Sequence, residues 1–82
     1  MIKIGDRVGL YLSETEKKIF FLGFGKYVGS KIPPHGVRGC ENGLPRPLFL
    51  LDDGREFYSS ECYYDTERSV RDKLSKKKLV MV

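Results

Sequence analysis

The chain has 82 residues, of which 40% are hydrophobic and 32% charged, and its formal net charge is +4 at pH 7. This size supports one domain with one small core, and the composition is too apolar for a disordered chain. No stretch reaches the roughly 18 consecutive apolar residues of a membrane helix, and the N-terminus lacks the apolar segment of a secretory signal, so we expect a cytoplasmic protein without a membrane partner.

The first predicted element is a strand over residues 7–12. Apolar and other residues alternate there, and Val8, Leu10 and Leu12 fall on the face that we expect to be buried. A polar turn at residues 13–17 follows.

A second, longer strand is predicted over residues 18–28, which are rich in aromatic and branched side chains. Gly23 and Gly25 interrupt it, and a glycine inside a strand indicates a bulge or bend. We therefore expect this strand to curve and to serve both halves of a sheet. The following residues 29–47 contain all four prolines of the chain, which predicts a long Pro/Gly loop.

The second half of the chain predicts a hairpin and then a helix. A short apolar strand at residues 48–51 leads into the turn signal Asp53-Gly54, and residues 55–64 return as one strand. Asp65 is a suitable N-cap for a helix over about residues 66–76. The apolar residues 79–82 fit either a closing strand or the last helical turn, and we favour a strand that pairs with the first strand.

These elements predict a mainly β (α+β) fold, namely a small SH3-like β-barrel of four to five antiparallel strands with one short C-terminal helix. Residues 1–82 would form this single domain. Residues 1–65 carry nine basic and nine acidic residues, so the whole positive excess lies in residues 66–82. A surface that attracts phosphate would therefore be the helix, with the candidate residues Arg68, Arg71, Lys73, Lys76, Lys77 and Lys78.

Two resemblances rest on these segments. Gly5-Asp-Arg-Val8, Gly23–Gly29 and Leu50–Gly54 resemble the strand signatures of SH3-like, Tudor and KOW-type barrels. The chain also resembles a group of small, uncharacterised phage and bacterial proteins. They share a leucine-, glycine- and tyrosine-containing segment, a Pro-Pro pair, a Leu-Asp-x-Gly hairpin and a Glu-Cys pair followed by two aromatic residues, matched here by Leu22–Gly29, Pro33-Pro34, Leu51–Gly54 and Glu61–Tyr64. The second resemblance implies a phage or mobile-element origin and no particular activity.

Aromatic side chains at the end of the returning strand are the candidate partner-binding residues. Tyr58, Tyr63 and Tyr64 would present their rings to a partner, together with His35 and Arg38 of the long loop. The alternative is that these tyrosines pack in the core with their hydroxyl groups at the rim.

We expect no catalytic residue, metal or cofactor. His35, Cys40 and Cys62 are too few and too irregularly spaced for a zinc site. Nothing in the sequence brings Cys62 beside a base, and free thiols are the default in a reducing cytosol.

The sequence favours a non-enzymatic binding module, a phage or mobile-element accessory protein of the host-takeover or anti-defence type that binds and modulates a host protein. One alternative is a nucleic-acid-binding barrel that uses the basic helix and the tyrosines. Another is a protein that sequesters a small ligand or nucleotide beneath the long loop. A monomer and a homodimer both fit, because the apolar residues 79–82 can pair within one chain or with a second copy.

Overall fold

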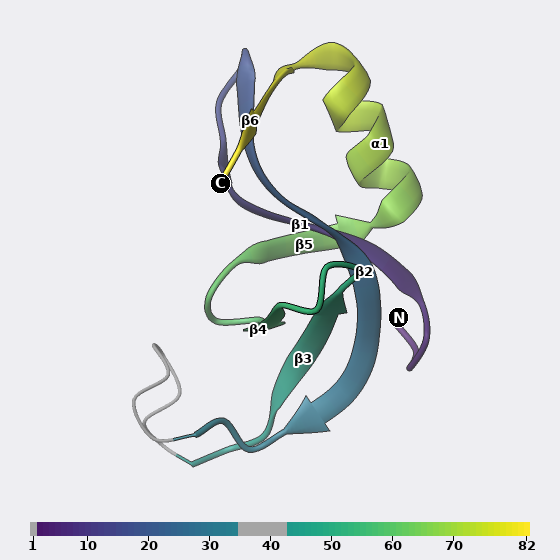
Figure 1. Ribbon diagram of the computed structural model, residues 1–82, viewed down its shortest axis with the longest axis vertical. Coiled ribbons are helices and arrows are strands. Elements are labelled where there is room, and N and C mark those ends of the chain that lie inside the picture. The colour runs from purple at the N-terminus through teal and green to yellow at the C-terminus, as the bar shows by residue number, and fades with distance from the viewer. Residues whose placement is uncertain (1, 35–42) are drawn as a thin grey trace.

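The computed structural model describes residues 2–34 and 43–82, which form a mainly β structure with one helix (Figure 1). In chain order the elements are β1 (Arg7–Glu14), β2 (Lys18–Lys31), β3 (Arg46–Leu51), β4 (Glu56–Tyr58), β5 (Tyr63–Thr66), α1 (Glu67–Lys76) and β6 (Lys78–Met81).

The sheet is organised around β2. Five strands lie in the order β4-β3-β2-β1-β5, and each neighbouring pair in this series is antiparallel. The part of β2 from Ile19 to Lys26 pairs with β1, and the part from Gly25 to Lys31 pairs with β3. Figure 1 shows β2 as one long curved ribbon. The prediction that the second strand curves and serves both halves of the sheet is confirmed.

A glycine permits this arrangement where β2 passes from one partner to the other. Gly25 pairs with Val8 of β1 and with Leu51 of β3. A Cβ atom at this position would overlap with the carbonyl oxygen of Leu50. Only glycine therefore lets β3 approach β2 so closely at this point.

The C-terminal strand lies on the edge of β2 that faces away from β1. β6 pairs in parallel with residues 18–21, beginning at the match of Lys18 with Lys78. The predicted strand is confirmed, but its predicted pairing with the first strand is wrong. From Val8 to Tyr11 both edges of β1 are occupied, by β2 and β5, whereas residues 18–21 of β2 are not paired with β3 and so accept β6.

The sheet does not close into the predicted barrel. Within the described residues its ends, β4 and β5, are not paired with each other. The single strand predicted over residues 55–64 is also wrong, because a turn at residues 59–62 separates β4 from β5. At this turn the Glu61 side chain accepts a hydrogen bond from the Tyr58 N–H at 2.9 Å, and the Glu61 N–H donates to the Tyr58 carbonyl at 2.9 Å.

The hairpin between β3 and β4 forms as predicted. Gly54 has a φ of +94°, a conformation that favours glycine. The Asp53 carboxylate accepts hydrogen bonds from the backbone N–H of Arg55 at 3.0 Å and from its guanidinium at 2.8 Å. The long loop is shorter than predicted, because β2 extends to Lys31 and β3 begins at Arg46.

The predicted helix forms, but its N-cap is Thr66 and not Asp65. The Thr66 hydroxyl accepts a hydrogen bond from the Ser69 N–H at 3.2 Å. Asp65 supports this cap from β5: its carboxylate accepts from the Thr66 N–H at 2.8 Å and from the Ser69 hydroxyl at 2.9 Å. Arg7 ties the start of the helix to the hairpin, because its guanidinium binds both Asp52, at 2.6 and 2.7 Å, and Glu67, at 3.2 Å.

The core has two parts, one on each face of β1. One part lies between β1, β2 and β3 and contains Val8, Leu10, Leu22, Phe49 and Leu51. The other lies beneath α1 and contains Tyr11, Ile19, Phe21 and Val70. Val70 is fully buried against Gly9, where a Cβ atom would lie 2.7 Å from the Val70 Cβ.

Burial on both faces explains why the predicted alternation along β1 fails. Tyr11 is buried on the helix-covered face, while Leu12 is 43% exposed. The β1–β2 register shifts between Tyr11 and Ser13, so Leu12 does not continue the buried series of Val8 and Leu10.

Replacing Gly9 with alanine is expected to lower the free energy of unfolding by about 1–3 kcal/mol, because the new methyl group overpacks against Val70. Urea denaturation measures this loss. In a Val70→Ala background, the same substitution should cost clearly less, because two of the three atoms that it meets are gone.

Gly54→Ala is the matched control, since its new methyl group meets no atom within 4 Å and its cost comes from the positive φ alone. Its cost should be the same in the wild-type and Val70→Ala backgrounds. Additive costs for Gly9→Ala and Val70→Ala would contradict the proposed contact.

Candidate functional site

One surface feature lies where β5 begins. It is a hollow of about 500 Å³, called here the β5 hollow, lined by Leu12 and by residues 59–64. β5 is the last strand on its side of the sheet, and no described strand pairs with its outer edge. The hollow is therefore lined by apolar and polar side chains at the start of a strand whose outer edge is open.

Tyr63 is the most exposed aromatic residue at this edge, with 63% of its surface accessible. Its ring stacks on the ring of Tyr11, with centroids 5.7 Å apart and planes 21° from parallel. Tyr11 is held in turn by Lys73, whose ammonium group lies 5.1 Å from the ring centroid and 3.4 Å from the hydroxyl oxygen. One face of the Tyr63 ring is thus packed on Tyr11, although most of the residue is exposed.

Tyr64 lies on the opposite face of β5, because side chains alternate along a strand. Its ring contacts Phe49 of the core, with centroids 4.5 Å apart, and 39% of the residue is exposed. Tyr64 lines the β5 hollow and also a second hollow of about 290 Å³ beside Ile2 and Arg7. It is therefore half core and half surface.

The structure brings two of the five candidate partner-binding residues together. Tyr63 and Tyr64 line the β5 hollow, whereas Tyr58 is partly buried in β4 and is not among the lining residues. His35 and Arg38 lie outside the described residues. Of the two alternatives, exposure on the surface describes Tyr63, whereas Tyr64 lies partly in the core and Tyr58 is partly buried.

Sequence reasoning missed Leu12 and Tyr11 as contributors to this surface. Leu12 was expected in the core, and only the register shift in β1 exposes it. Tyr11 supports Tyr63 because the β1–β5 register places these two residues opposite each other. Such pairing between distant segments leaves no signal in the spacing of either strand.

Cys62 lies in the wall of the hollow as a free, partly buried thiol. Burial, with a smaller contribution from the neighbouring Glu61 carboxylate, raises the pKa of Cys62 to about 12. Its Sγ atom lies 3.9 Å from the Tyr58 carbonyl oxygen. A thiol with this pKa is protonated at neutral pH, whereas a nucleophilic cysteine needs a lowered pKa.

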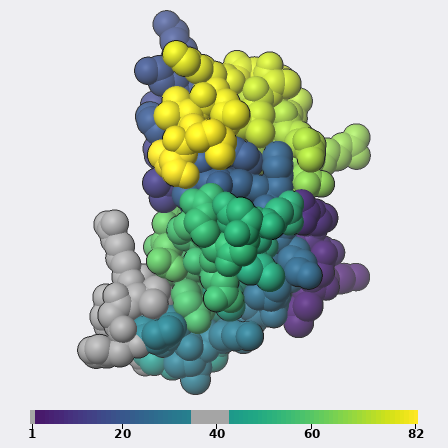
Figure 2. Space-filling view, viewed as in Figure 1, coloured from purple at the N-terminus to yellow at the C-terminus, as the bar shows by residue number. Residues whose placement is uncertain are grey.

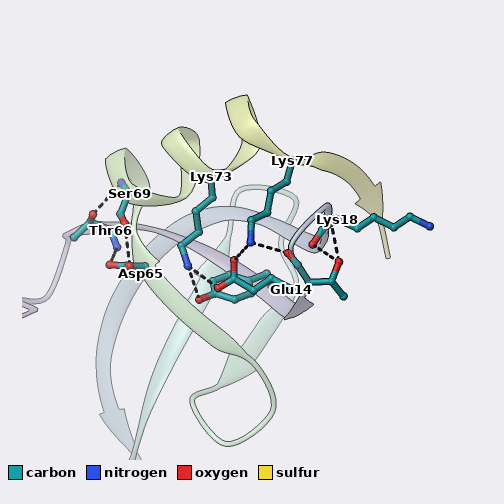
Figure 3. Close-up of polar contacts among 9 residues, drawn as sticks. Glu14, Lys18, Asp65, Thr66, Ser69, Lys73 and Lys77 are labelled. Atoms are coloured by element: carbon teal, nitrogen blue, oxygen red, sulfur yellow. Dashed lines mark hydrogen bonds and ion pairs between the residues drawn. The ribbon is translucent and has the colours of Figure 1, made fainter.

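Two lysines of the basic segment are bound by one carboxylate from a distant part of the chain. Glu14, at the end of β1, binds Lys73 at 2.7 Å and Lys77 at 2.9 Å (Figure 3). Hydrogen bonds from Lys73 and Lys77 hold the pKa of Glu14 below its usual value, and the bond to Glu14 raises the pKa of Lys73. Lys77 also donates to the Thr15 carbonyl at 2.7 Å.

Two further candidates on the helix have partners as well. Arg71 approaches Glu67 at 3.5 Å and lies 4.4 Å above the Phe24 ring, and Lys76 binds Asp72 at 3.1 Å. Among the described residues, Arg68 and Lys78 have no ion-pair partner. Four of the six basic candidates are thus engaged within the chain.

Within residues 2–34 and 43–82 there is no group of three or more metal-binding side chains. The described part of the chain also has no helix that is both long and apolar enough to span a membrane. Comparison of the chain with protein-family models, curated proteins and solved structures finds no match. The likeness to small phage and bacterial proteins therefore stays an expectation from the sequence.

The Glu14 ion pairs predict a pH dependence of stability. Because the folded state lowers the pKa of Glu14 below 4.5, these pairs stabilise the protein above that pH. Their contribution is lost as the pH falls through the folded pKa. Glu14→Gln should cost a few tenths to about 1 kcal/mol at pH 7 and should flatten the acid side of a plot of melting temperature against pH. Equal acid limbs for both proteins would contradict this role.

The raised pKa of Cys62 predicts slow alkylation. In a Cys40→Ser variant, where Cys62 is the remaining thiol, iodoacetamide at pH 8 should modify the folded protein at least roughly tenfold more slowly than the urea-unfolded protein. Mass spectrometry follows the reaction. Equal rates in the folded and unfolded states would show that Cys62 is accessible and ionisable.

Proposed function

We propose that this chain is a non-enzymatic binding module that recognises another protein at the β5 hollow. The observation that carries the proposal is Tyr63, an exposed aromatic ring held in place by Tyr11 beside an open strand edge. Rigid aromatic side chains dominate the energy of many protein interfaces, because they bury a large area at a small cost in entropy.

The lining of the β5 hollow suits a protein segment better than a small ligand. Leu12 and the two tyrosines offer apolar surface, and Ser59 adds a polar side chain. The outer edge of β5 adds backbone groups of the kind that pair with an extended peptide. We infer that a partner strand or loop lies along β5 with an apolar side chain against Tyr63.

The strand order gives further support. We infer that β5-β1-β2-β3-β4, with a bent β2 shared between two halves, is an opened form of the SH3-like arrangement. Small barrels of this kind more often bind than catalyse, although a fold alone is weak evidence for function. In line with the sequence resemblance, we propose a phage or mobile-element origin and a host protein as the partner.

The nucleic-acid alternative has less support. A phosphate backbone is bound by exposed, uncommitted lysine and arginine side chains. Here Lys73 and Lys77 are bound to Glu14, and Lys76 to Asp72. The exposed Tyr63 also lies on β5, whereas Arg68, which has no ion pair among the described residues, lies on α1.

Capture from nuclease-treated host lysate tests the proposal. Wild-type protein should retain one stoichiometric partner, Tyr63→Phe should retain it nearly as well, and Tyr63→Ala should weaken binding by roughly tenfold or more, as expected for an interface aromatic. Biolayer interferometry with the purified partner would measure the change.

Ile32→Ala is the matched control, because Ile32 is 65% exposed, close to the 63% of Tyr63, and does not line the hollow. It should bind like wild type. No stoichiometric partner, equal loss in both alanine variants, or binding that disappears with nuclease would each refute the proposal.

A further inference from the structure

Another open edge of the sheet lies at β6. Three apolar side chains are exposed there: Leu79 at 45%, Met81 at 60% and Val82 at 46%. Figure 2 shows this C-terminal segment, in yellow, lying uncovered on the visible face. No described strand pairs with the outer edge of β6.

The hydrogen bonds between β6 and β2 show which backbone groups face outward. The N–H groups of Lys78 and Val82 donate to the carbonyl groups of Lys17 and Phe21, at 2.8 and 3.1 Å. Because alternate residues of a strand point their backbone groups to the same edge, the N–H and C=O groups of Leu79 and Met81 point away from β2. They form the unpaired edge.

Side chains on this strand follow the same alternation. Leu79 and Met81 are matched with Ile19 and Phe21, which are buried beneath the helix-covered part of the sheet. An added strand would extend this face and cover Leu79 and Met81 with its own alternate side chains. Natural proteins commonly protect such edges with charge or with a covering element.

Charge at one end of the edge indicates what the added strand carries. Lys18 and Lys78 are matched in the parallel register at the start of β6. Neither side chain has an ion-pair partner among the described residues. Figure 3 shows the Lys18 side chain pointing away from the Glu14 cluster. The edge is therefore apolar along its length and basic where it begins.

We propose that the β6 edge binds an extended peptide segment that has alternating apolar side chains and acidic residues at its C-terminal end. Antiparallel addition is the more stable arrangement, and it places the C-terminal end of the peptide beside Lys78, with Lys18 one strand further away on β2. A second copy of the chain fits less well, because the net charge of +4 opposes association of two copies. This inference concerns a different surface from the proposed function, so either can fail alone.

A synthetic peptide tests the inference. The probe is a fluorescein-labelled peptide of alternating valine and threonine that ends in two aspartates. The control peptide is identical except that it ends in two lysines. Fluorescence anisotropy at low salt should show binding of the acidic peptide with an affinity on the order of tenfold higher than that of the basic peptide. High salt should reduce the difference, since exposed charges are screened.

Proline substitutions separate edge pairing from simple charge attraction. Met81→Pro removes an outward-facing N–H group, and an edge strand tolerates proline on its solvent side. It should keep the melting temperature close to that of wild type and lower peptide affinity at least roughly fivefold. Leu79→Pro provides a second variant of the same kind. Val80→Pro is the contrasting control, because its N–H group faces β2 and its loss should destabilise the fold.

A charge swap supplies the last comparison. In Lys18→Glu/Lys78→Glu the preference should reverse in favour of the basic peptide. The inference is overturned by absence of binding, by equal binding of both peptides, or by affinity that Met81→Pro and Leu79→Pro leave unchanged. Dimerisation in analytical ultracentrifugation that Met81→Pro abolishes would also overturn it, because the edge would then bind a second copy.

Discussion

The close approach of β3 to β2 at Gly25 is the constraint on which the rest of the structure depends. With no Cβ atom at this position, β2 can leave β1 and pair with β3 within a few residues. One strand of 14 residues thereby serves three neighbours: β1, β3 and β6. A side chain at position 25 would force β3 away from β2 and would separate Phe49 and Leu51 from the core that they complete on β1.

The open edges at β5 and β6 follow from this sharing of β2. Its first residues, 18–21, bend away from β3 and leave an edge that β6 takes. Among the described residues β5 pairs with β1 alone and β6 with β2 alone, so each of them keeps one open edge. A closed barrel would have paired such edges, and the open sheet presents them to solvent instead.

Local patterns in the sequence predicted the local elements well. The glycines of β2, the Asp53-Gly54 turn and the helix after residue 65 each carry a signal within a few residues. Pairing and register between segments far apart in the sequence carry no such signal. The exposure of Leu12 depends on a register shift against β2. The break before β5 is local, since the Tyr58 N–H donates to the Glu61 side chain, but the apolar pattern of residues 55–64 did not predict it. The partner of β6 depends on which edge is free, which only the assembled sheet decides.

Charge also shows that a count along the sequence does not predict contacts between distant segments. The count places the whole positive excess in residues 66–82, but ion pairs in the folded protein join those residues to other segments. Glu14 belongs to a segment that is neutral overall, yet it binds both Lys73 and Lys77 and so fixes the helix on β1. Within the described part of the chain, the cations left without ion pairs include Lys18, which the count assigns to the neutral half. Where Lys18 meets Lys78 the basic surface is therefore built from both halves of the chain, beside an apolar edge rather than along a helix.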